Sequence, residues 1–349
     1  MTERRVTPAA LADFTARAFR AVGMPQADAR SVALLMAEAD ARGSDGHGIF
    51  RLPQYIRRIK AGGINLRPDI RVVQERAATA VIDGHNAMGH LVMRRAAGLA
   101  ITKAKENGIG WVGARHSNHA GPAALYARMV LPHDMIGLYL AVGNANHLPP
   151  WGGTEMLLST NPIAIAVPGR DRPPIVLDMA TTNAAYGKVK VKAQRNELMP
   201  QGWMVDRRGQ PLTDPHRANE GFLLPIGEAK GYGLALMFGL LAGSLNGAAF
   251  GKEVVDFNAD DRSVTNTGHA IMALDIGAFG DVDAFRAKVD ETWRVMQASP
   301  TLPDFDAVRL PGEHAAQVYA DRTTNGIPVP EELQRSLDAM AASLGIASL

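Results

Sequence analysis

Short apolar runs alternate with helical segments through the middle of this chain, and this alternation constrains the fold more than any other feature. Helical periodicity is found at residues 88–107, 120–129 and 282–297. Two further runs, at 70–73 and 78–82, are arranged like a hairpin. Strands that alternate with helices predict an α/β domain, with the main strands at residues 109–114, 136–141, 163–167, 175–178 and 270–275.

The two ends of the 349-residue chain have a different pattern, because both are helical. Thr7-Pro8 is typical of a helix start, and residues 7–42 predict two helices. A third helix is expected over residues 47–61, and the tail at 330–347 is helical again. We therefore predict a helical domain from residues 1–68 and 325–349, and an α/β domain over residues 69–324.

The segment from Gly231 to Phe250 is almost wholly apolar and long enough to span a bilayer. Gly239, Gly243 and Gly247 recur at every fourth residue, which thins one helical face so that another backbone can approach. Because the segment lies inside a globular pattern, we predict a buried core helix against a sheet and no membrane association.

Composition excludes several classes of protein. The formal charge is only +2 and the basic residues are scattered, which argues against nucleic-acid binding. There are no cysteines, so disulfides and thiolate chemistry are excluded. The first residues lack an apolar stretch of the kind found in signal peptides, and we expect a cytoplasmic protein.

Three residues with complementary chemistry follow the second predicted helix. His47, Arg51 and Tyr55 are spaced at i, i+4 and i+8, which places them on one face if this segment is helical. The imidazole can transfer a proton, the guanidinium can bind a carboxylate, and the phenol lies beside both. A capping histidine and a surface arginine are the structural alternative.

The sequence Gly108-Ile-Gly-Trp-Val-Gly113 matches the dinucleotide fingerprint G-x-G-x-x-G. That motif works where it follows a strand and opens a helix. Here it follows a predicted helix and enters a predicted strand, so Gly108 is interpreted as a helix C-cap and a Rossmann fold is not favoured.

Four polar, glycine-containing segments lie at the ends of the predicted elements and together indicate one ligand cleft. The first contains His119 and opens a predicted helix at Gly121-Pro122, where free amides can bind an anion. His116 and His119 lack a third nearby ligand, so no metal site is predicted. The other segments carry Thr160 and Asn161, then Asp178 with Tyr186-Gly-Lys188, and finally Lys230, whose position at a helix start suits a phosphate.

Five ordered motifs between Ala39 and Glu313 resemble those of the malate/L-lactate dehydrogenase family, whose members use NAD or NADP without a Rossmann fold. Relatives include ureidoglycolate, sulfolactate and diketogulonate dehydrogenases and the cyclic-ketimine reductases. The motifs are His-Gly-Ile-Phe-Arg-Leu-Pro-Gln-Tyr, Ser-Asn-His-Ala-Gly, Thr-Asn-Pro-Ile-Ala, Asp-Met-Ala-Thr-Thr and Lys-Gly-Tyr-Gly-Leu-Ala. The resemblance implies a non-Rossmann NAD(P)-binding α/β domain with a smaller all-helical domain, a homodimer, and a small substrate that carries a carboxylate.

The resemblance also implies roles for individual residues. His119, His47 and Lys188 are expected to be catalytic, with His119 as the proton donor or acceptor. Arg51, Tyr55 and Thr160 are expected to bind substrate, with Arg51 on its carboxylate. The cofactor is expected to contact His119, Ala120, Gly121, Asp178, Met179, Ala180, Lys230, Gly231, Arg309, Gly312 and Glu313.

Two positions depart from the patterns of relatives. Gly46 precedes His47 where relatives usually have Ser, and Lys188 stands where ketimine reductases have Asp. The Tyr-Gly-Lys form resembles the hydroxy-acid branch, so we expect hydride transfer between NAD(P)H and a 2-oxo or 2-hydroxy acid. Reduction of a cyclic ketimine, such as piperideine- or pyrroline-2-carboxylate, is the alternative. A nucleotide-binding protein without catalysis is a third reading.

Overall fold

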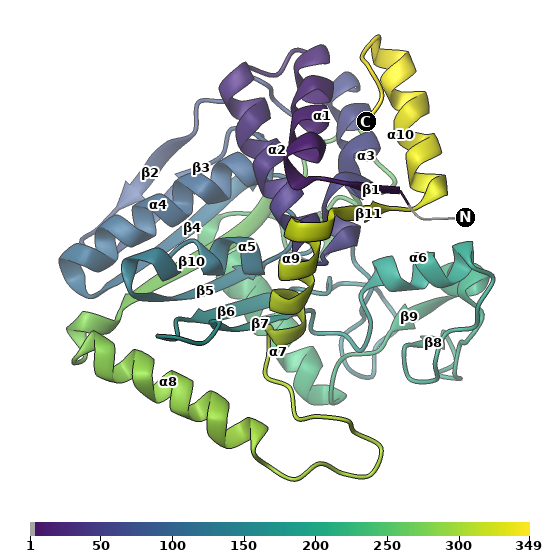
Figure 1. Ribbon diagram of the computed structural model, residues 1–349. Coiled ribbons are helices and arrows are strands. Elements are labelled where there is room, and N and C mark those ends of the chain that lie inside the picture. The colour runs from purple at the N-terminus through teal and green to yellow at the C-terminus, as the bar shows by residue number, and fades with distance from the viewer. Residues whose placement is uncertain (1–3) are drawn as a thin grey trace.

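A seven-stranded mixed sheet forms the centre of the molecule (Figure 1). The computed structural model describes residues 4–349. In this sheet, as far as the structure describes it, β3 (Thr79–Asp83) and β4 (Ile109–Ser117) pair in parallel, and all other neighbouring strands pair antiparallel. The strand order is β2 (Arg71–Glu75), β3 (Thr79–Asp83), β4 (Ile109–Ser117), β10 (Thr267–Asp275), β5 (Met135–Ala141), β6 (Ile163–Val167) and β7 (Ile175–Met179). The prediction of an α/β domain is confirmed, as is the hairpin of β2 and β3.

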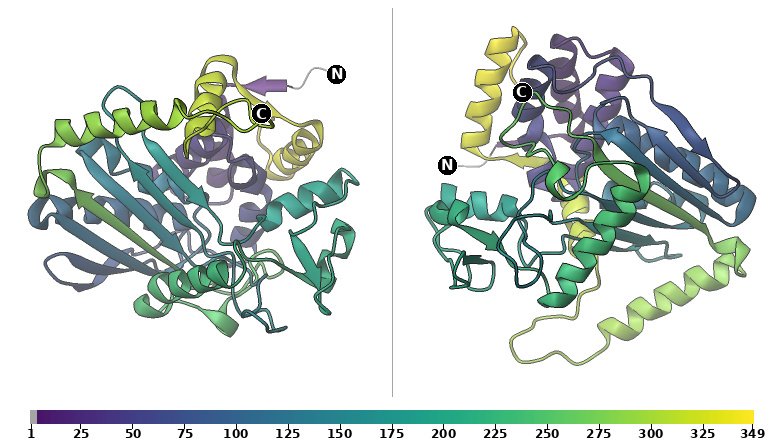
Figure 2. Two further views of the ribbon diagram at one scale, coloured as in Figure 1. Left: turned by 90° about the horizontal axis from the view of Figure 1, so that it is seen from below. Right: turned by 180° about the vertical axis from the view of Figure 1, so that it is seen from behind.

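Helices cover both faces of this sheet because its strands alternate their side chains between the two sides. On β5, Met135 and Tyr139 belong to the core shared with α4 (Gly89–Asn107) and α5 (Ala124–Arg128). Leu140 belongs to the core on the other face, which includes Ala242 of α7 (Ala229–Ala242). Figure 2 shows α7 on the face opposite α4, and α8 (Val282–Gln297) along one side of the sheet.

The N-terminal and C-terminal segments pack together above the sheet in Figure 1. β1 (Arg4–Val6) pairs antiparallel with β11 (Ile327–Val329), which joins the two ends of the chain. A separate core includes Phe14, Met36 and Leu337. The helices of this region are α1 (Pro8–Ala21), α2 (Gln26–Ala41), α3 (Leu52–Lys60) and α10 (Glu331–Leu344), with α9 (Glu313–Asn325) leading into it from the sheet side. The domain boundaries given above stay a prediction.

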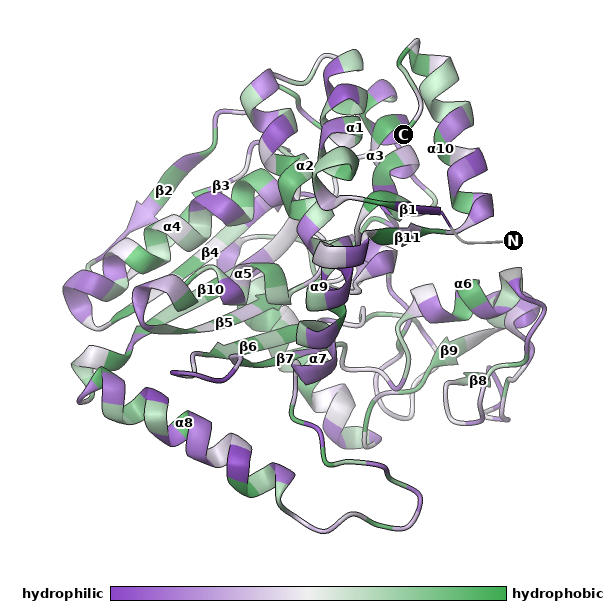
Figure 3. Ribbon diagram, viewed as in Figure 1, coloured by the Kyte–Doolittle hydropathy of each residue, from purple (hydrophilic) through white to green (hydrophobic). Residues whose placement is uncertain are grey.

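A small lobe that the sequence analysis did not anticipate lies beside the sheet (Figure 1). It comprises α6 (Tyr186–Gln194) and the antiparallel pair of β8 (Met204–Asp206) and β9 (Gly221–Leu223), around a core that includes Val189 and Met199. Figure 3 shows that the strands of the large sheet are predominantly apolar, whereas polar and apolar residues alternate along α8 and α10.

Three helices differ from their predicted extents. The helix expected over 47–61 is broken at Gly48 into two 3₁₀ turns, Asp45–His47 and Ile49–Arg51, and α3 begins only at Leu52. The segment at 231–250 is not one helix, because α7 ends at Ala242. α5 begins at Ala124 rather than near Gly121 and has five residues.

The burial of α7 also differs from the prediction. Ala235, Gly239 and Ala242 are buried, whereas Leu234, Met237 and Leu240 are exposed. The helix is therefore apolar on both its sheet-facing and its outer side. In the part of the chain that the structure describes, no helix combines the length and apolar character needed to cross a bilayer.

Candidate active site

A cavity of about 160 Å³ lies where β4, β5 and β10 approach the loop before α3 and the start of α6. Its walls combine imidazoles, cations and amides with small apolar residues from the sheet. Its polar and charged side chains include those of His47, Arg51, His119, Thr160, Lys190 and Asn258. Five segments far apart in sequence therefore supply the polar chemistry of one cavity, and three of them, those with His47 and Arg51, with His119 and with Thr160, were among the predicted site segments.

His119 stands two residues beyond the end of β4 and is held in one orientation. Its Nδ1 lies 2.6 Å from the Tyr55 hydroxyl and 3.4 Å from the Gly121 amide nitrogen. Burial raises the pKa of Tyr55, so the phenol keeps its proton and can donate it to Nδ1. Two donors at Nδ1 leave the imidazole proton on Nε2. Burial first, and then the charges of Arg51 and His47, hold the pKa of His119 well below its usual value.

The neighbours of His119 form a stacked aromatic group. The His47 ring lies 5.6 Å from the His119 ring, with an angle of 11° between the planes. Phe257 lies 5.3 Å from the same imidazole, at 21°. Burial, with a smaller contribution from Arg51, lowers the pKa of His47 to about 4. Both histidines are therefore neutral before a ligand brings negative charge into the cavity.

Two cations meet at one neutral amide on the opposite wall. Arg51 Nη1 donates to Asn258 Oδ1 at 3.3 Å and Lys190 Nζ donates to the same oxygen at 3.2 Å. Arg51 is also fixed by bonds to the Gly46 carbonyl and to Gln54. None of these contacts neutralises a charge. Asp256, which accepts a hydrogen bond from the Asn258 amide nitrogen at 3.2 Å, offsets part of the charge of Lys190, so two cations face one carboxylate and the wall can bind an anionic ligand. His147, stacked 4.1 Å from Tyr186, extends the same wall.

A second tyrosine–histidine pair forms part of the cavity and was missed from the sequence. The Tyr139 hydroxyl lies 2.7 Å from His269 Nδ1, while His269 Nε2 lies 3.3 Å from the Asn118 carbonyl oxygen. Because a carbonyl only accepts, His269 donates from Nε2 and accepts at Nδ1. Side chains alternate between the two faces of the sheet along β5 and β10, and those of Tyr139 and His269 both point toward α4 and α5. No sequence motif distinguishes either residue.

The predicted catalytic and substrate residues are not all in the cavity. His47, Arg51, His119 and Thr160 line it, as do Ala120 and Gly121. Tyr55 is fully buried behind His119, to which its hydroxyl is bonded, and lies outside the cavity lining. Lys188 is exposed on α6, whereas Lys190 faces the cavity. Successive helical residues are about 100° apart, so the two lysines point in different directions.

The other predicted cofactor residues gather around β7. Asp178, at its end, accepts a hydrogen bond from the Ala124 amide at 3.0 Å, and Met179 and Ala180 follow directly. That amide is thus occupied by the protein's own carboxylate and is not free for an anion, in contrast to the expectation for this helix start. Burial raises the pKa of Asp178 to about 6.

Two more segments are attached to β7 and to the residues that directly follow it. The Val176 amide donates to the Pro311 carbonyl at 3.0 Å, and a side chain at Gly312 would lie 2.9 Å from the Val176 carbonyl oxygen. This close contact places the 309–313 loop, with Arg309 and Glu313, beside β7. The Ile226 amide donates to the Thr181 carbonyl at 3.0 Å, which anchors the turn before Lys230 and Gly231.

These residues fit a nicotinamide cofactor. A cavity of about 160 Å³ is too small for a dinucleotide, which needs a cleft of several hundred Å³. It has room for a reacting ring and a small acid, and the segments around β7 extend from it. Asp178 supplies a carboxylate of the kind that binds ribose hydroxyls, and Lys230 supplies a charge of the kind that binds phosphate.

An α/β fold whose cavity combines a carboxylate-binding wall with proton-carrying imidazoles defines an enzyme that acts on small organic acids. Residues 6–338 match the family model described as malate/L-lactate dehydrogenase. The chain is 37% identical to the malate dehydrogenase of Pyrococcus horikoshii, over 99% of this chain and 97% of that protein. It is 38% identical to the L-sulfolactate dehydrogenase of Methanocaldococcus jannaschii, over 93% and 92%.

Solved structures show the same similarity. The malate dehydrogenase of Pyrococcus horikoshii superimposes with a TM-score of 0.91, covering 99% of this chain and 97% of that chain at 35% identity. A delta1-piperideine-2-carboxylate reductase from Pseudomonas syringae pvar. tomato gives a TM-score of 0.86, covering 97% and 99% at 28% identity.

The chain belongs to the malate/L-lactate dehydrogenase family. It is an oxidoreductase that uses a nicotinamide cofactor and acts on hydroxy acids. This confirms the class of enzyme predicted from the motifs. It also argues against the alternative of a nucleotide-binding protein without catalysis.

Proposed function

We propose that the enzyme interconverts a 2-hydroxy acid and its 2-oxo acid, and that its preferred substrate carries a second negative group. The observation behind this proposal is the pair of cations, Arg51 and Lys190, that share the Asn258 oxygen on the wall of the cavity. One cation suffices for the carboxylate next to the reacting carbon. The second has no role for a monocarboxylate, whereas it suits a dicarboxylate such as malate or a sulfonated acid such as sulfolactate.

In this proposal the cofactor, NAD or NADP, accepts or supplies the hydride. Arg51 binds the carboxylate and Lys190 binds the distal anion, so the substrate is oriented at both ends. Thr160 contacts the substrate from the sheet side. In the reductive direction His119 carries a proton on both ring nitrogens when substrate is bound, with the Nδ1 proton donated to the Tyr55 oxygen. It gives its Nε2 proton to the carbonyl oxygen as the hydride arrives and is left as a neutral ring, while His47 orients the substrate beside it. A bound carboxylate offsets the charge of Arg51, one of the groups that lower the pKa of His119, so substrate binding prepares this imidazole to carry a proton.

Cyclic-ketimine reduction is the weaker candidate. Its support is the similarity to a piperideine-carboxylate reductase, at 28% identity. The Ser and Asp expected of that activity are absent, since Gly46 and an exposed Lys188 occupy those positions. A ketimine monocarboxylate also leaves Lys190 without a partner in the cavity.

A spectrophotometric screen tests the proposal. Oxaloacetate, sulfopyruvate, pyruvate and pyrroline-2-carboxylate are compared as substrates for NADH and NADPH oxidation. We expect the two dianionic acids to have a kcat/KM at least about tenfold above that of pyruvate, the factor that about 1.4 kcal/mol of transition-state binding provides. A preference for the imine overturns the choice of substrate, and no oxidation with any acid overturns the function.

We also propose that the enzyme is a cytoplasmic homodimer. Support for a dimer comes from the exposed apolar side chains of α7, namely Leu234, Met237 and Leu240. A row of this kind on one helix is typical of an interface. Support for the cytoplasm is that soluble nicotinamide cofactors are reduced and reoxidised there.

A further inference from the structure

Asp40, near the end of α2, is a buried carboxyl group directly beneath the loop that carries His47 and Arg51. Its exposed fraction is 2%. Asp40 Oδ2 accepts a hydrogen bond from the Ile49 amide at 2.7 Å. A side chain at Gly48 would lie between 2.1 and 2.2 Å from the three carboxyl atoms of Asp40, so the carboxyl group fills the space that any residue other than glycine would need.

The loop above Asp40, residues 43–51, is called the substrate loop here. It consists of two short 3₁₀ turns that meet at Gly48, and it lacks the repeated hydrogen bonds of a helix. His47 ends the first turn and Arg51 ends the second. The Asp40–Ile49 bond holds the backbone between them, so it fixes the distance and angle between the imidazole and the guanidinium.

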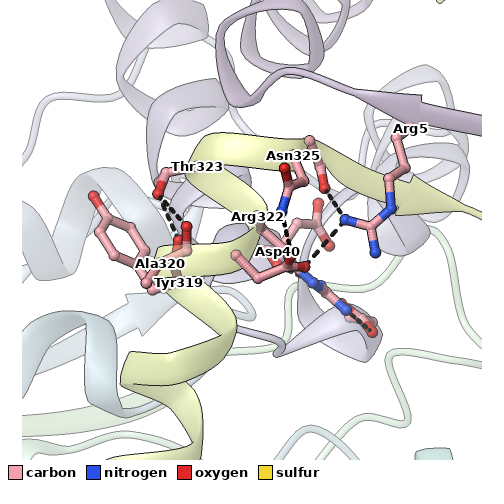
Figure 4. A network of polar contacts seen from close by, with 10 residues as sticks. Arg5, Asp40, Tyr319, Ala320, Arg322, Thr323 and Asn325 are labelled. Atoms are coloured by element: carbon pink, nitrogen blue, oxygen red, sulfur yellow. Dashed lines mark hydrogen bonds and ion pairs between the residues drawn. The ribbon is translucent and has the colours of Figure 1, made fainter.

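A second contact fixes Asp40 from the opposite side. Arg322 of α9 donates to the Asp40 backbone carbonyl and pairs with the Asp45 carboxylate in the substrate loop (Figure 4). The Arg322 side chain is only 12% exposed. One guanidinium therefore ties the end of α2 to the first turn of the loop, and the carboxyl group of Asp40 ties it to the second turn.

We propose that Asp40 is the positioning residue of the substrate loop: its carboxyl group holds Gly48 and Ile49 so that His47 and Arg51 face the substrate together. Asp40 acts through the backbone and does not touch the cavity itself. The kinetic part of this inference rests on the proposed function, because Arg51 is taken as the carboxylate-binding residue. The structural part, the support of the loop by one carboxyl group, stands without it.

Three substitutions separate the two contributions of the carboxyl group. Asp40→Asn keeps both the volume and an acceptor oxygen for the Ile49 amide. Asp40→Leu keeps the volume and removes the acceptor, and Asp40→Ala removes both. A buried amide without a partner costs about 1–3 kcal/mol, so opening of the loop is expected to become about 5- to 150-fold more frequent in the Leu and Ala variants.

Two measurements report on the loop. The first is hydrogen exchange of the Ile49 amide in the full-length protein without substrate, which needs no enzymatic activity. The second is the separation of KM from kcat, with KM for the cofactor as a reference. We expect Asp40→Leu and Asp40→Ala to speed hydrogen exchange of the Ile49 amide at least about fivefold. Both should raise KM for the substrate at least about tenfold, while KM for the cofactor changes less than about twofold. Asn is expected to restore both values to within about threefold of wild type.

Asp28→Ala provides the matched control, because it makes the same substitution in the first turn of the same helix. It is expected to leave Ile49 exchange and substrate KM within about twofold of wild type. The proposal is overturned if Leu and Ala leave both values unchanged, or if Asn is as damaging as Ala. If the wild-type protein oxidises no hydroxy acid, the proposed function fails, and the exchange data then decide the loop proposal by themselves. If Asp40→Ala does not fold, Asp40→Leu still tests the proposal, because it fills the same space with an apolar group of similar size.

Discussion

Proton transfer depends on His119 in the proposed reaction, because its Nδ1 is already occupied and only Nε2 faces the cavity. His119→Ala should therefore lower kcat by about 10² to 10⁴-fold, the usual contribution of general acid catalysis, and change substrate KM much less. His47→Ala should have the smaller effect on kcat. Steady-state kinetics in the reductive direction provides the check. If His47→Ala lowers kcat strongly while His119→Ala stays near wild type, the roles of the two histidines are reversed.

Arg51 and Lys190 are proposed to bind different groups of the substrate. Arg51→Met should raise KM for every carboxylate, since it removes the cation next to the reacting carbon. Lys190→Met should raise KM at least about tenfold for oxaloacetate and leave that for pyruvate within about twofold, because only the former has a distal anion. Kinetics with this pair of substrates measures the difference. If KM rises equally for both acids, Lys190 does not bind the distal anion and only adds positive charge to the cavity.

Asp40 should make stability depend on pH. Burial raises its pKa from 3.8 to about 8, with Asp45 adding to the increase and the Ile49 amide and Arg322 opposing it. Since the folded state holds this proton more tightly, the wild type loses stability as pH rises from about 4 to 8. Asp40→Asn has no such loss. Its Tm minus that of the wild type should therefore increase across this range and then level off, as measured by thermal unfolding at each pH. A difference that stays flat from pH 4 to 8 would mean that Asp40 is already ionised in the folded protein.

Most of the site could be predicted because its residues lie in short motifs at the ends of strands. His119 and Thr160 were found in this way, and His47 and Arg51 were found from their chemistry. Lys190 was missed although it is two residues from Lys188, because the helix that separates their directions was not predicted. Tyr139, His269 and Asp40 carry no local signal. Each acquires its role from a partner more than eight residues away in sequence.

At the level of elements, strands and long helices followed from periodicity, whereas segments containing glycine did not. Gly48 divides the predicted helix over 47–61, and Gly243 follows the last residue of α7. Spacing alone cannot distinguish a glycine that admits a neighbouring backbone from one that ends a helix. The small lobe of α6, β8 and β9 was missed for a related reason, since its strands have only three residues each.

The glycines of the false dinucleotide fingerprint have a packing role instead. A side chain at Gly110 would lie 2.1 Å from the Ala100 carbonyl oxygen, where β4 packs against α4. Gly110→Ala should therefore lower the free energy of unfolding by about 1–3 kcal/mol, as overpacking does. Gly98→Ala on α4 is the control, because nothing lies within 4 Å of the added methyl group, and it should be neutral or stabilising by up to about 1 kcal/mol. Denaturant unfolding measures both, and equal values would contradict a packing role.

At the level of the whole molecule, the outer face of α7 is the clearest candidate for contact with a second copy. Met237 is 53% exposed between Leu234 and Leu240 on a helix whose other side is buried against the sheet. A charge in such a row destabilises an interface because it loses water on association. Met237→Glu should convert the proposed dimer to a monomer that still unfolds in one cooperative transition, as measured by light scattering and thermal unfolding.

The control for this prediction is Leu198→Glu, which introduces the same charge at a side chain that is 70% exposed in a different part of the molecule, the small lobe beyond α6. It should leave the mass of the proposed dimer unchanged. Among the described residues, the cavity lining comes from the substrate loop, the large sheet and its connecting loops, the segment with Phe257 and Asn258, and α6, and no lining position lies on α7. The Met237→Glu monomer should consequently keep its KM for substrate within about twofold, the scatter expected for independent sites. A wild-type protein that is monomeric at micromolar concentration, or a Leu198→Glu variant that dissociates as readily, would remove α7 as the interface.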